Sequence, residues 1–226
     1  MNPEKHIEPL QLVTHPFDDN MPFHQAKLAL EGGCRWIQLR MKNYCVKDII
    51  SEGKKIIELK KRYDFQFIIN DYPEVAIELN ADGVHLGKND VDPRDARKIL
   101  GDNLIVGGTA NTVEDIEYLV GEGVDYIGLG PFRFTSTKEN LSPVIGLDGY
   151  EKRVTCMKQK NISIPVVAIG SVKLNDVEQL IQTGLYGIAV SSSIIKAASI
   201  ADTTKLFLKK IHKSKNHDHY KTIEVG

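Results

Sequence analysis

The sequence predicts an α/β protein built as a single (β/α)8 TIM barrel. Eight short runs rich in apolar and β-branched residues alternate with longer stretches of helical period. The chain of 226 residues is long enough for one barrel of this kind, and no linker-like segment divides it. A doubly wound open sheet is the alternative, because periodicity alone does not show whether a sheet closes.

The expected strands are spaced along most of the chain, at 10–14, 36–40, 65–70, 82–86, 104–109, 125–130, 165–170 and 186–191. The clearest helices lie between them, at 46–63, 112–123 and 174–184. Isoleucines fall mostly on one face of the first helix. The second begins with Thr112 and Asp115 at the spacing of a capping box, and the third ends on Gly184, which suits a helix C-terminus. We therefore expect a catalytic barrel domain over 1–213 and a polar, mobile tail over 214–226.

Composition narrows the classes of partner. The net charge is −1, with 42% hydrophobic and 26% charged residues, which argues against nucleic-acid and membrane-surface partners. No apolar run is long enough to cross a bilayer, and the first residues do not resemble a signal peptide. The cysteines lack metal-ligand spacing, so we expect reduced thiols in a cytoplasmic protein. The oligomeric state stays open, a homo-oligomer included.

In such a barrel the residues that follow the strands form one mouth, where active sites are built. Carboxylates, cations, small hydroxyls and glycines gather there. From the second strand onward they are Gln38, Arg40, Lys42, Asn70, Asp71, His85, Lys88, Asp90, Gly107, Gly108, Thr109, Gly170, Ser171, Ser191, Ser192 and Ser193. This mixture indicates a phosphorylated small-molecule substrate together with a divalent cation.

Asp71 and Asp90 end neighbouring strands and could share one ion. Mg²⁺ prefers few carboxylates, several waters and phosphate oxygens, and Arg40, Lys42 and Lys138 would add positive charge nearby. Alternatively, the two aspartates cap the helices that begin near residues 73 and 93. The coincidence of two carboxylates at adjacent strand ends favours the metal.

Three further segments favour phosphate binding. The loop "TSTKEN" (135–140) offers hydroxyls and an ammonium group, and "AIGSV" (168–172) and "AVSSSI" (189–194) follow strands seven and eight. In phosphate-binding barrels those two loops present backbone N–H groups to a phosphate. His85 is either a general base or a packed histidine bonded to the backbone.

With these residues assembled, the sequence resembles the thiamine phosphate synthase (thiamine-phosphate pyrophosphorylase) family over nearly its whole length. Six motifs in order carry the resemblance: "QLRMK" (38–42), "IIND" (68–71), "GVHLGKND" (83–90), "DYIGLGPFRFTSTK" (125–138), "PVVAIGSV" (165–172) and "GIAVSSSI" (187–194). The resemblance implies a transferase that couples hydroxymethylpyrimidine diphosphate with hydroxyethylthiazole phosphate, giving thiamine phosphate and pyrophosphate. It also implies Mg²⁺ as cofactor and a dissociative loss of pyrophosphate.

The resemblance assigns three groups of residues. The pyrimidine diphosphate would be bound by Gln38, Leu39, Arg40, Met41, Lys42, Asn70, Thr109 and Lys138, of which Arg40, Lys42 and Lys138 would stabilise the departing charge. The thiazole phosphate would be bound by Thr135, Ser136, Thr137, Gly170, Ser191 and Ser192. Asp71 and Asp90 would hold Mg²⁺.

A few positions depart from the family pattern. This chain has Thr109 where the family commonly has serine, and Ser171 where it has glycine. It has Lys88 where glutamine is common and Tyr72 where arginine is common. The alternatives are a thiazole tautomerase-like relative that lacks coupling activity and a non-catalytic protein that binds a phosphorylated ligand. The loop from Pro131 to Pro143 is expected to act as a lid.

Overall fold

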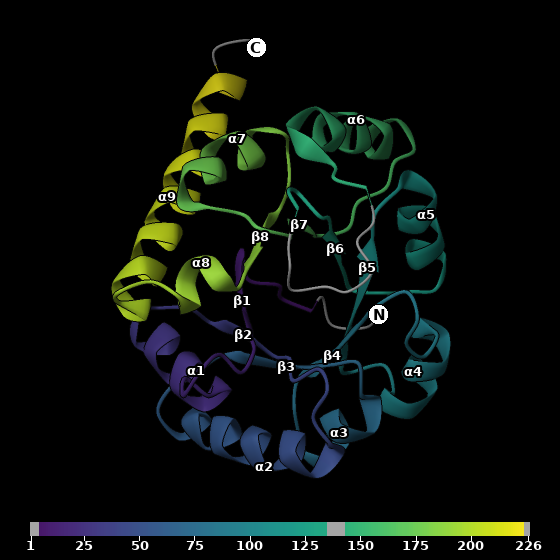
Figure 1. Ribbon diagram of the computed structural model, residues 1–226. Coiled ribbons are helices and arrows are strands. Elements are labelled where there is room, and N and C mark those ends of the chain that lie inside the picture. Colours follow the sequence, from purple (N-terminus) through teal and green to yellow (C-terminus); the bar gives the residue numbers. More distant parts are fainter. Residues whose placement is uncertain (1–4, 135–142, 224–226) are drawn as a thin grey trace.

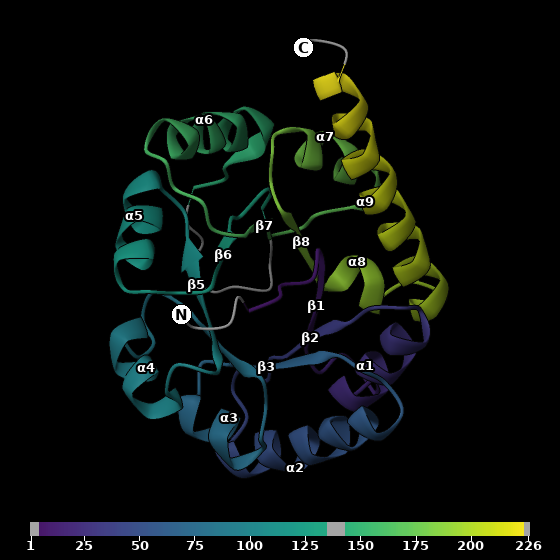
Figure 2. The same cartoon turned by 180° about the vertical axis from the view of Figure 1, so that it is seen from behind.

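Eight parallel strands close into a barrel in chain order, β1 beside β2 and onward to β8, which pairs again with β1. A computed structural model describes residues 5–134 and 143–223, with side chains to residue 216. Figures 1 and 2 show the strands surrounded by the helices. The strands are β1 (Leu10–Thr14), β2 (Trp36–Leu39), β3 (Gln66–Asn70), β4 (Gly83–Leu86), β5 (Ile105–Ala110), β6 (Tyr126–Leu129), β7 (Val166–Ala168) and β8 (Gly187–Val190).

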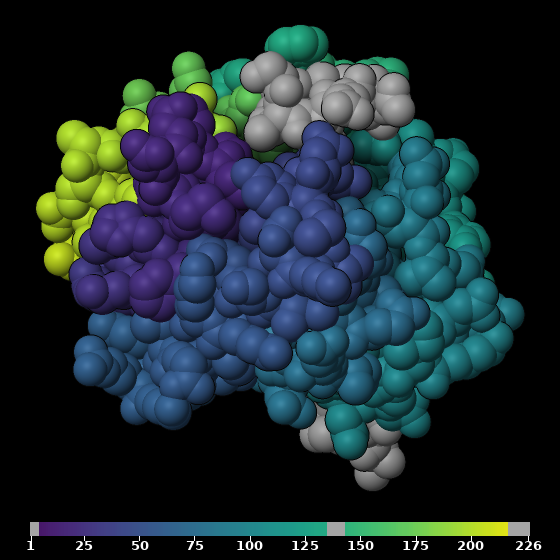
Figure 3. Space-filling model, turned by 60° about the horizontal axis from the view of Figure 1, so that its bottom comes forward, coloured from purple at the N-terminus to yellow at the C-terminus, as the bar shows by residue number. Residues whose placement is uncertain are grey.

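Helices cover the outside of the barrel. They are α1 (Pro22–Glu31), α2 (Val46–Ile57), η1 (Glu58–Lys61), α3 (Pro73–Glu78), α4 (Pro93–Leu100), α5 (Val113–Gly121), α6 (Gly146–Gln159), η2 (Leu174–Asp176), α7 (Val177–Gln182), α8 (Ser192–Ile195) and α9 (Ile200–Ile223). In Figure 3 the colours pass from purple through blue to teal across one face. Helices that follow one another in sequence therefore lie side by side, as right-handed β–α–β connections require.

The apolar side chains form two layers, because successive residues of a strand point to opposite faces. Trp36, Ile68, Tyr126 and Val167 pack together inside the barrel, whereas Ile37, Ile69 and their equivalents pack against the helices. Gly107 makes room for Tyr126, since a Cβ at Gly107 would lie 2.2 Å from the tyrosine ring. The barrel is thus a filled core, open for chemistry only at its ends.

The predicted strands are confirmed to within two residues at each end, and closure of the sheet rules out the open doubly wound alternative. The expected helix 46–63 ends earlier as an α-helix and continues as the short 3₁₀ segment η1. The capping box is confirmed: the Asp115 N–H donates to Thr112 Oγ1 (3.2 Å), and the Thr112 N–H donates to Asp115 Oδ2 (2.9 Å).

The C-terminal region differs from the expected tail. Helix α9 continues through Ile223, across the boundary placed at residue 213, and extends beyond the ring of helices in Figures 1 and 2. Phe207, Ile211 and Ser214 are buried, and Lys215 Nζ lies 4.2 Å from the centre of the Tyr186 ring. The lysine-rich sequence favours helix even where apolar periodicity fades. The domain division at residue 213 remains a prediction.

Cys34, Cys45 and Cys156 are unpaired. Among the described residues, no helix is both long and apolar enough to cross a membrane.

Replacing Thr112 by alanine should lower the free energy of unfolding by about 1 kcal/mol, because the first turn of α5 loses its cap. Urea unfolding measures the difference. Thr155, exposed within α6, offers a matched control, since Thr155→Ala removes no cap and places a better helix former there. Equal loss of stability in the two variants would contradict the role of the capping box.

Candidate active site

The ends of β3 and β4 bring two carboxylates into contact. The side chains of Asp71 and Asp90 lie close enough to interact, and both line one cavity at these strand ends. Asp71 takes a positive φ of 71° just after β3, and its N–H donates to the carbonyl oxygen of His85 on β4 (2.9 Å). Such a φ is uncommon for a residue other than glycine and often marks functional positions. The carboxylate of Asp90 accepts the Gly87 N–H (2.7 Å), which fixes it within its own loop.

Neither aspartate caps a helix, so the alternative of helix capping is wrong. The residue before α3 is Tyr72, which makes no side-chain cap. The residue before α4 is Asp92, whose carboxylate accepts the Arg94 N–H (2.9 Å). Asp71 and Asp90 instead line the same cavity at the mouth of the barrel.

The contact changes the acidity of Asp71. Burial, reinforced by the hydrogen bond and the negative charge of Asp90, raises the pKa of Asp71 to about 6. Lys42 opposes this shift, with Nζ 3.2 Å from Asp71 Oδ2. Two carboxylates this close repel each other when both are charged, and a proton or a cation relieves the repulsion.

Cationic side chains from the end of β2 surround the pair. Arg40 lies close enough for both Asp71 and Asp90 to act on its charge, although burial is the larger effect and lowers the pKa of Arg40. A cavity of about 390 Å³ opens between these loops. It is lined by Met41, Lys42, Asn43, Asn70, Asp71, Tyr72, Asn89, Asp90 and Val91. The structure therefore brings together the predicted residues Arg40, Met41, Lys42, Asn70, Asp71 and Asp90.

The donor set fits Mg²⁺ better than a metal held by protein alone. The described residues contain no cluster of three or more His, Cys, Asp or Glu side chains that could hold a metal. Two carboxylates in contact, beside the amide of Asn70, leave most coordination positions to water and phosphate oxygens, which is the arrangement Mg²⁺ favours.

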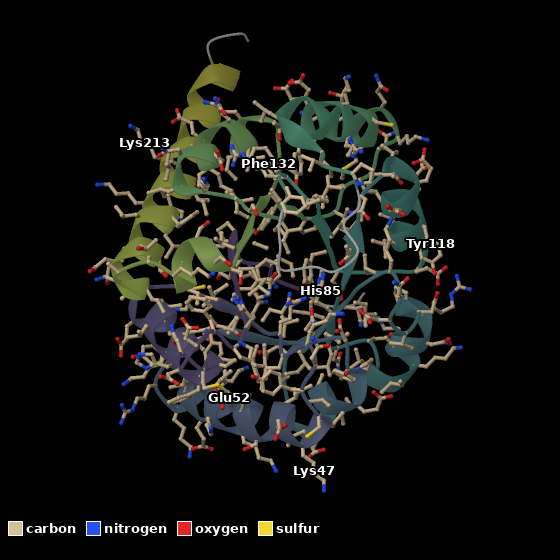
Figure 4. All side chains as sticks on the ribbon, viewed as in Figure 1. Lys47, Glu52, His85, Tyr118, Phe132 and Lys213 are labelled. Carbon is tan, nitrogen blue, oxygen red and sulfur yellow. The ribbon has the colours of Figure 1, made fainter. Side chains whose placement is uncertain are left out.

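Below this cavity, polar side chains form a network inside the barrel. The Tyr126 hydroxyl lies 3.0 Å from His85 Nδ1 and 3.2 Å from Gln11 Nε2, and Gln38 Nε2 donates to Gln11 Oε1 (3.2 Å). His85 Nε2 lies 3.0 Å from Thr109 Oγ1. Figure 4 shows His85 near the centre of the ring of strands, with Tyr118 and Lys47 on the outer helices. His85 is buried and lies within hydrogen-bond distance of the side chains of Tyr126 and Thr109.

The loops after β7 and β8 form a second region of the mouth. Gly170 has a φ of 97°, and a Cβ there would lie 2.7 Å from Pro131 Cα, so only glycine fits. The Ser171 hydroxyl donates to the Phe134 carbonyl oxygen (2.8 Å). Ser191 donates to the Val13 carbonyl oxygen (2.5 Å) and Ser193 to the Val172 carbonyl oxygen (2.6 Å).

Lys88, expected to add charge beside the metal, points instead to Asp115, with Nζ 2.6 Å from Oδ2. That ion pair lies in a neighbouring cavity of about 280 Å³, and Asp90 borders both cavities. Asp115 also accepts the N–H groups of Asn111 (2.8 Å) and Thr112 (2.9 Å). Lys88 thereby links the β4–α4 loop to the start of α5.

Thr135, Ser136, Thr137 and Lys138 lie outside the described residues, as does most of the expected lid. Their roles remain predictions. His15, which directly follows β1, lies at the mouth and was not predicted from the strand ends. Strand alternation could have found it, because Gln11 and Val13 point into the barrel and His15 continues the same side.

The raised pKa of Asp71 predicts how stability depends on pH in buffer without divalent cations. The folded protein keeps a proton on Asp71 up to about pH 6, whereas the unfolded chain loses it near pH 4. The folded state therefore binds more protons in this window, and the free energy of unfolding falls as pH rises from about 4 to about 6.

Asp71→Asn cannot ionise, so it should remove this fall and stabilise the cation-free protein at neutral pH by on the order of 2 kcal/mol. Urea unfolding at several pH values measures the effect. Asp19, exposed in the β1–α1 loop, gives the control: Asp19→Asn should follow the wild-type curve. An Asp71→Asn curve parallel to wild type would show that the pair does not share a proton.

Comparison with known proteins agrees with this geometry. The family described as "Thiamine monophosphate synthase" matches residues 10–194. A thiamine-phosphate synthase of Phocaeicola vulgatus is 47% identical over 204 residues, which covers 90% of this chain and 98% of that protein. One from Flavobacterium johnsoniae is 48% identical over 184 residues, with 81% and 85% covered.

The fold comparison points the same way. The solved structure of a thiamine phosphate pyrophosphorylase from Pyrococcus furiosus superposes with a TM-score of 0.80 at 31% identity, covering 91% of this chain and 96% of that one. The order of the strands, the paired aspartates at their ends and these matches agree: the chain belongs to the thiamine monophosphate synthase family, whose members are transferases of thiamine biosynthesis.

Proposed function

We propose that the protein couples hydroxymethylpyrimidine diphosphate with hydroxyethylthiazole phosphate and releases pyrophosphate. The observation that carries the proposal is the contact of Asp71 with Asp90, beside Lys42 and Arg40, at the wall of a 390 Å³ cavity. A carboxylate pair with adjacent cations suits a diphosphate that arrives with a divalent cation. Membership of the family supports the same substrates.

In this function Asp71 and Asp90 would hold Mg²⁺, and Asn70 at the end of β3 would contact the pyrimidine diphosphate. When bound, the ion neutralises charge that develops on the leaving diphosphate. Lys42 and Arg40 act on the same charge from the end of β2. The family resemblance assigns Lys138 to the same group of cations. The resemblance implies that the carbon–oxygen bond breaks before the new bond forms. Groups that stabilise the departing anion are compatible with that order, which requires no side-chain nucleophile.

The pyrimidine ring would lie above the network inside the barrel. Gln38 and Thr109 are held there by hydrogen bonds to Gln11 and His85, so their polar atoms keep fixed positions. Leu39 is buried on the opposite face of β2 and packs outward, so its part in binding is through the backbone. This preorganisation holds the cation that forms on the pyrimidine for capture by the thiazole nitrogen.

The thiazole phosphate would lie at the ends of β7 and β8. Gly170, Ser192 and the segment Thr135–Thr137 are the groups that the resemblance assigns to it. The Ser191 hydroxyl already donates to Val13, so this residue contributes to the site through its position and its backbone. The cytoplasmic location expected from the cysteines, and the oligomeric state, remain predictions.

The decisive experiment incubates the purified protein with both substrates and Mg²⁺ and measures thiamine phosphate and pyrophosphate. Asp71→Ala and Asp90→Ala should each lower kcat/KM by roughly a hundredfold or more and raise the Mg²⁺ concentration needed for half-maximal rate. Normal turnover of Asp71→Ala across Mg²⁺ concentrations would contradict the metal assignment.

Asp92 provides the matched control for this experiment. It lies two residues from Asp90 but caps α4 and contacts Tyr118. Asp92→Ala should therefore lower the melting temperature while leaving the Mg²⁺ dependence unchanged. Isomerisation of the thiazole without coupling would favour the tautomerase-like alternative. Binding of both ligands without release of pyrophosphate would favour a non-catalytic binding protein.

A further inference from the structure

His15 lies at the end of β1, beside the start of α8, and its backbone is fixed from both sides. Gln25, fully buried on α1, accepts the His15 N–H on Oε1 (3.2 Å) and donates from Nε2 to the His15 carbonyl oxygen (2.7 Å). The same amide nitrogen donates to the Asn20 carbonyl oxygen (2.6 Å). A buried side chain that binds the loop in this way fixes the His15 backbone at the end of β1.

The hydrogen bonds around the ring determine its tautomer. The Ser191 hydroxyl donates to the Val13 carbonyl oxygen (2.5 Å), so its oxygen can only accept from His15 Nδ1, 2.9 Å away. Nδ1 therefore carries the proton. Val13 and Ser191 face each other because β1 and β8 pair with Gln11 beside Ala189 and Leu12 beside Val190.

The charges that act on His15 are both cationic. Burial, followed by Arg40 and Lys196, holds the pKa of His15 below its ordinary value, so the free protein carries a neutral ring. Lys196 Nζ lies 4.2 Å from the centre of the Phe17 ring, and Phe17 meets His15 edge to face with ring centres 6.3 Å apart. Within the described residues, His15 Nε2 has no hydrogen-bond partner. This corner has an excess of positive charge and suits an anion.

We propose that His15 is a positioning residue of the thiazole-phosphate site, which orients Ser191 so that the β8–α8 turn keeps its phosphate-binding shape. The inference rests on the proposed function, since it takes the phosphate to lie beside Ser191. The imidazole acts through the serine: Nδ1–H donates to the serine oxygen, and the serine hydroxyl in turn donates to Val13 and holds the turn against β1. Loss of the Nδ1–H would remove one of the two hydrogen bonds that fix the Ser191 side chain and so loosen the turn.

The test measures binding of the thiazole phosphate alone by calorimetry and steady-state kinetics with both substrates. His15→Phe keeps a ring but loses the donor, and should weaken thiazole-phosphate binding about tenfold, as expected for one hydrogen bond. The KM for the pyrimidine diphosphate should stay unchanged. His15→Asn presents an amide N–H near the place of Nδ1 and should restore affinity to within about threefold of wild type.

Two further variants distinguish a positioning role of His15 from a nonspecific loss of structure. In a Ser191→Ala background, His15→Phe should cause no additional loss, because the residue it acts through is already gone. His24, exposed on α1, is the control: His24→Phe should bind as wild type. The proposal fails if His15→Phe and His15→Asn are equally impaired, if the losses of the double variant add, or if wild type does not bind the thiazole phosphate. Binding with no coupling would overturn the proposed function and leave this inference intact.

Discussion

Two carboxylates held in contact within a partly buried pocket need a proton or a cation between them, and the rest of the site follows from this constraint. The contact exists because parallel strands β3 and β4 end at the same level, with the Asp71 N–H bonded to the His85 carbonyl oxygen. Arg40 and Lys42 at the end of β2 place positive charge beside the pair. The two carboxylates thus concentrate negative charge at the mouth of the barrel, and a metal ion bound to a diphosphate can neutralise it.

The fold was predictable to a large extent, because its signals are local. Alternation of β-rich and helical segments gave the strands, and Thr112 with Asp115 marked the start of α5. Helix α9 was underestimated, since a polar helix shows weak periodicity and its buried face depends on its neighbours α1 and α7. Closure of the barrel could not be read from the sequence, because it depends on pairing between β1 and β8, far apart in the chain.

In the candidate site, too, local signals could be predicted and contacts between distant segments could not. Strand ends predicted Asp71, Asp90, Lys42 and Arg40, because the position of a residue at the mouth needs only the strand boundary. Strand boundaries do not predict which side chains form ion pairs or hydrogen bonds with residues of other strands and loops. The contact of Lys88 with Asp115 joins two loops, and the donation of the Ser191 hydroxyl to Val13 needs the register of β1 on β8. Side chains that bind each other across strands are fixed by three-dimensional packing and leave no periodic signal.

The charge of Arg40 acts on both sides of the mouth. Its charge acts on Asp71 and Asp90 on one side and on His15 on the other, although these belong to the ends of β3, β4 and β1. In the proposed function the diphosphate binds on the first side and the thiazole phosphate on the second. Each anion then lowers the excess of positive charge that the other one meets, so the two would compete weakly for Arg40 unless a cation accompanies the diphosphate. In that function the paired aspartates would supply the place for the cation, so that one mouth could hold two phosphorylated substrates.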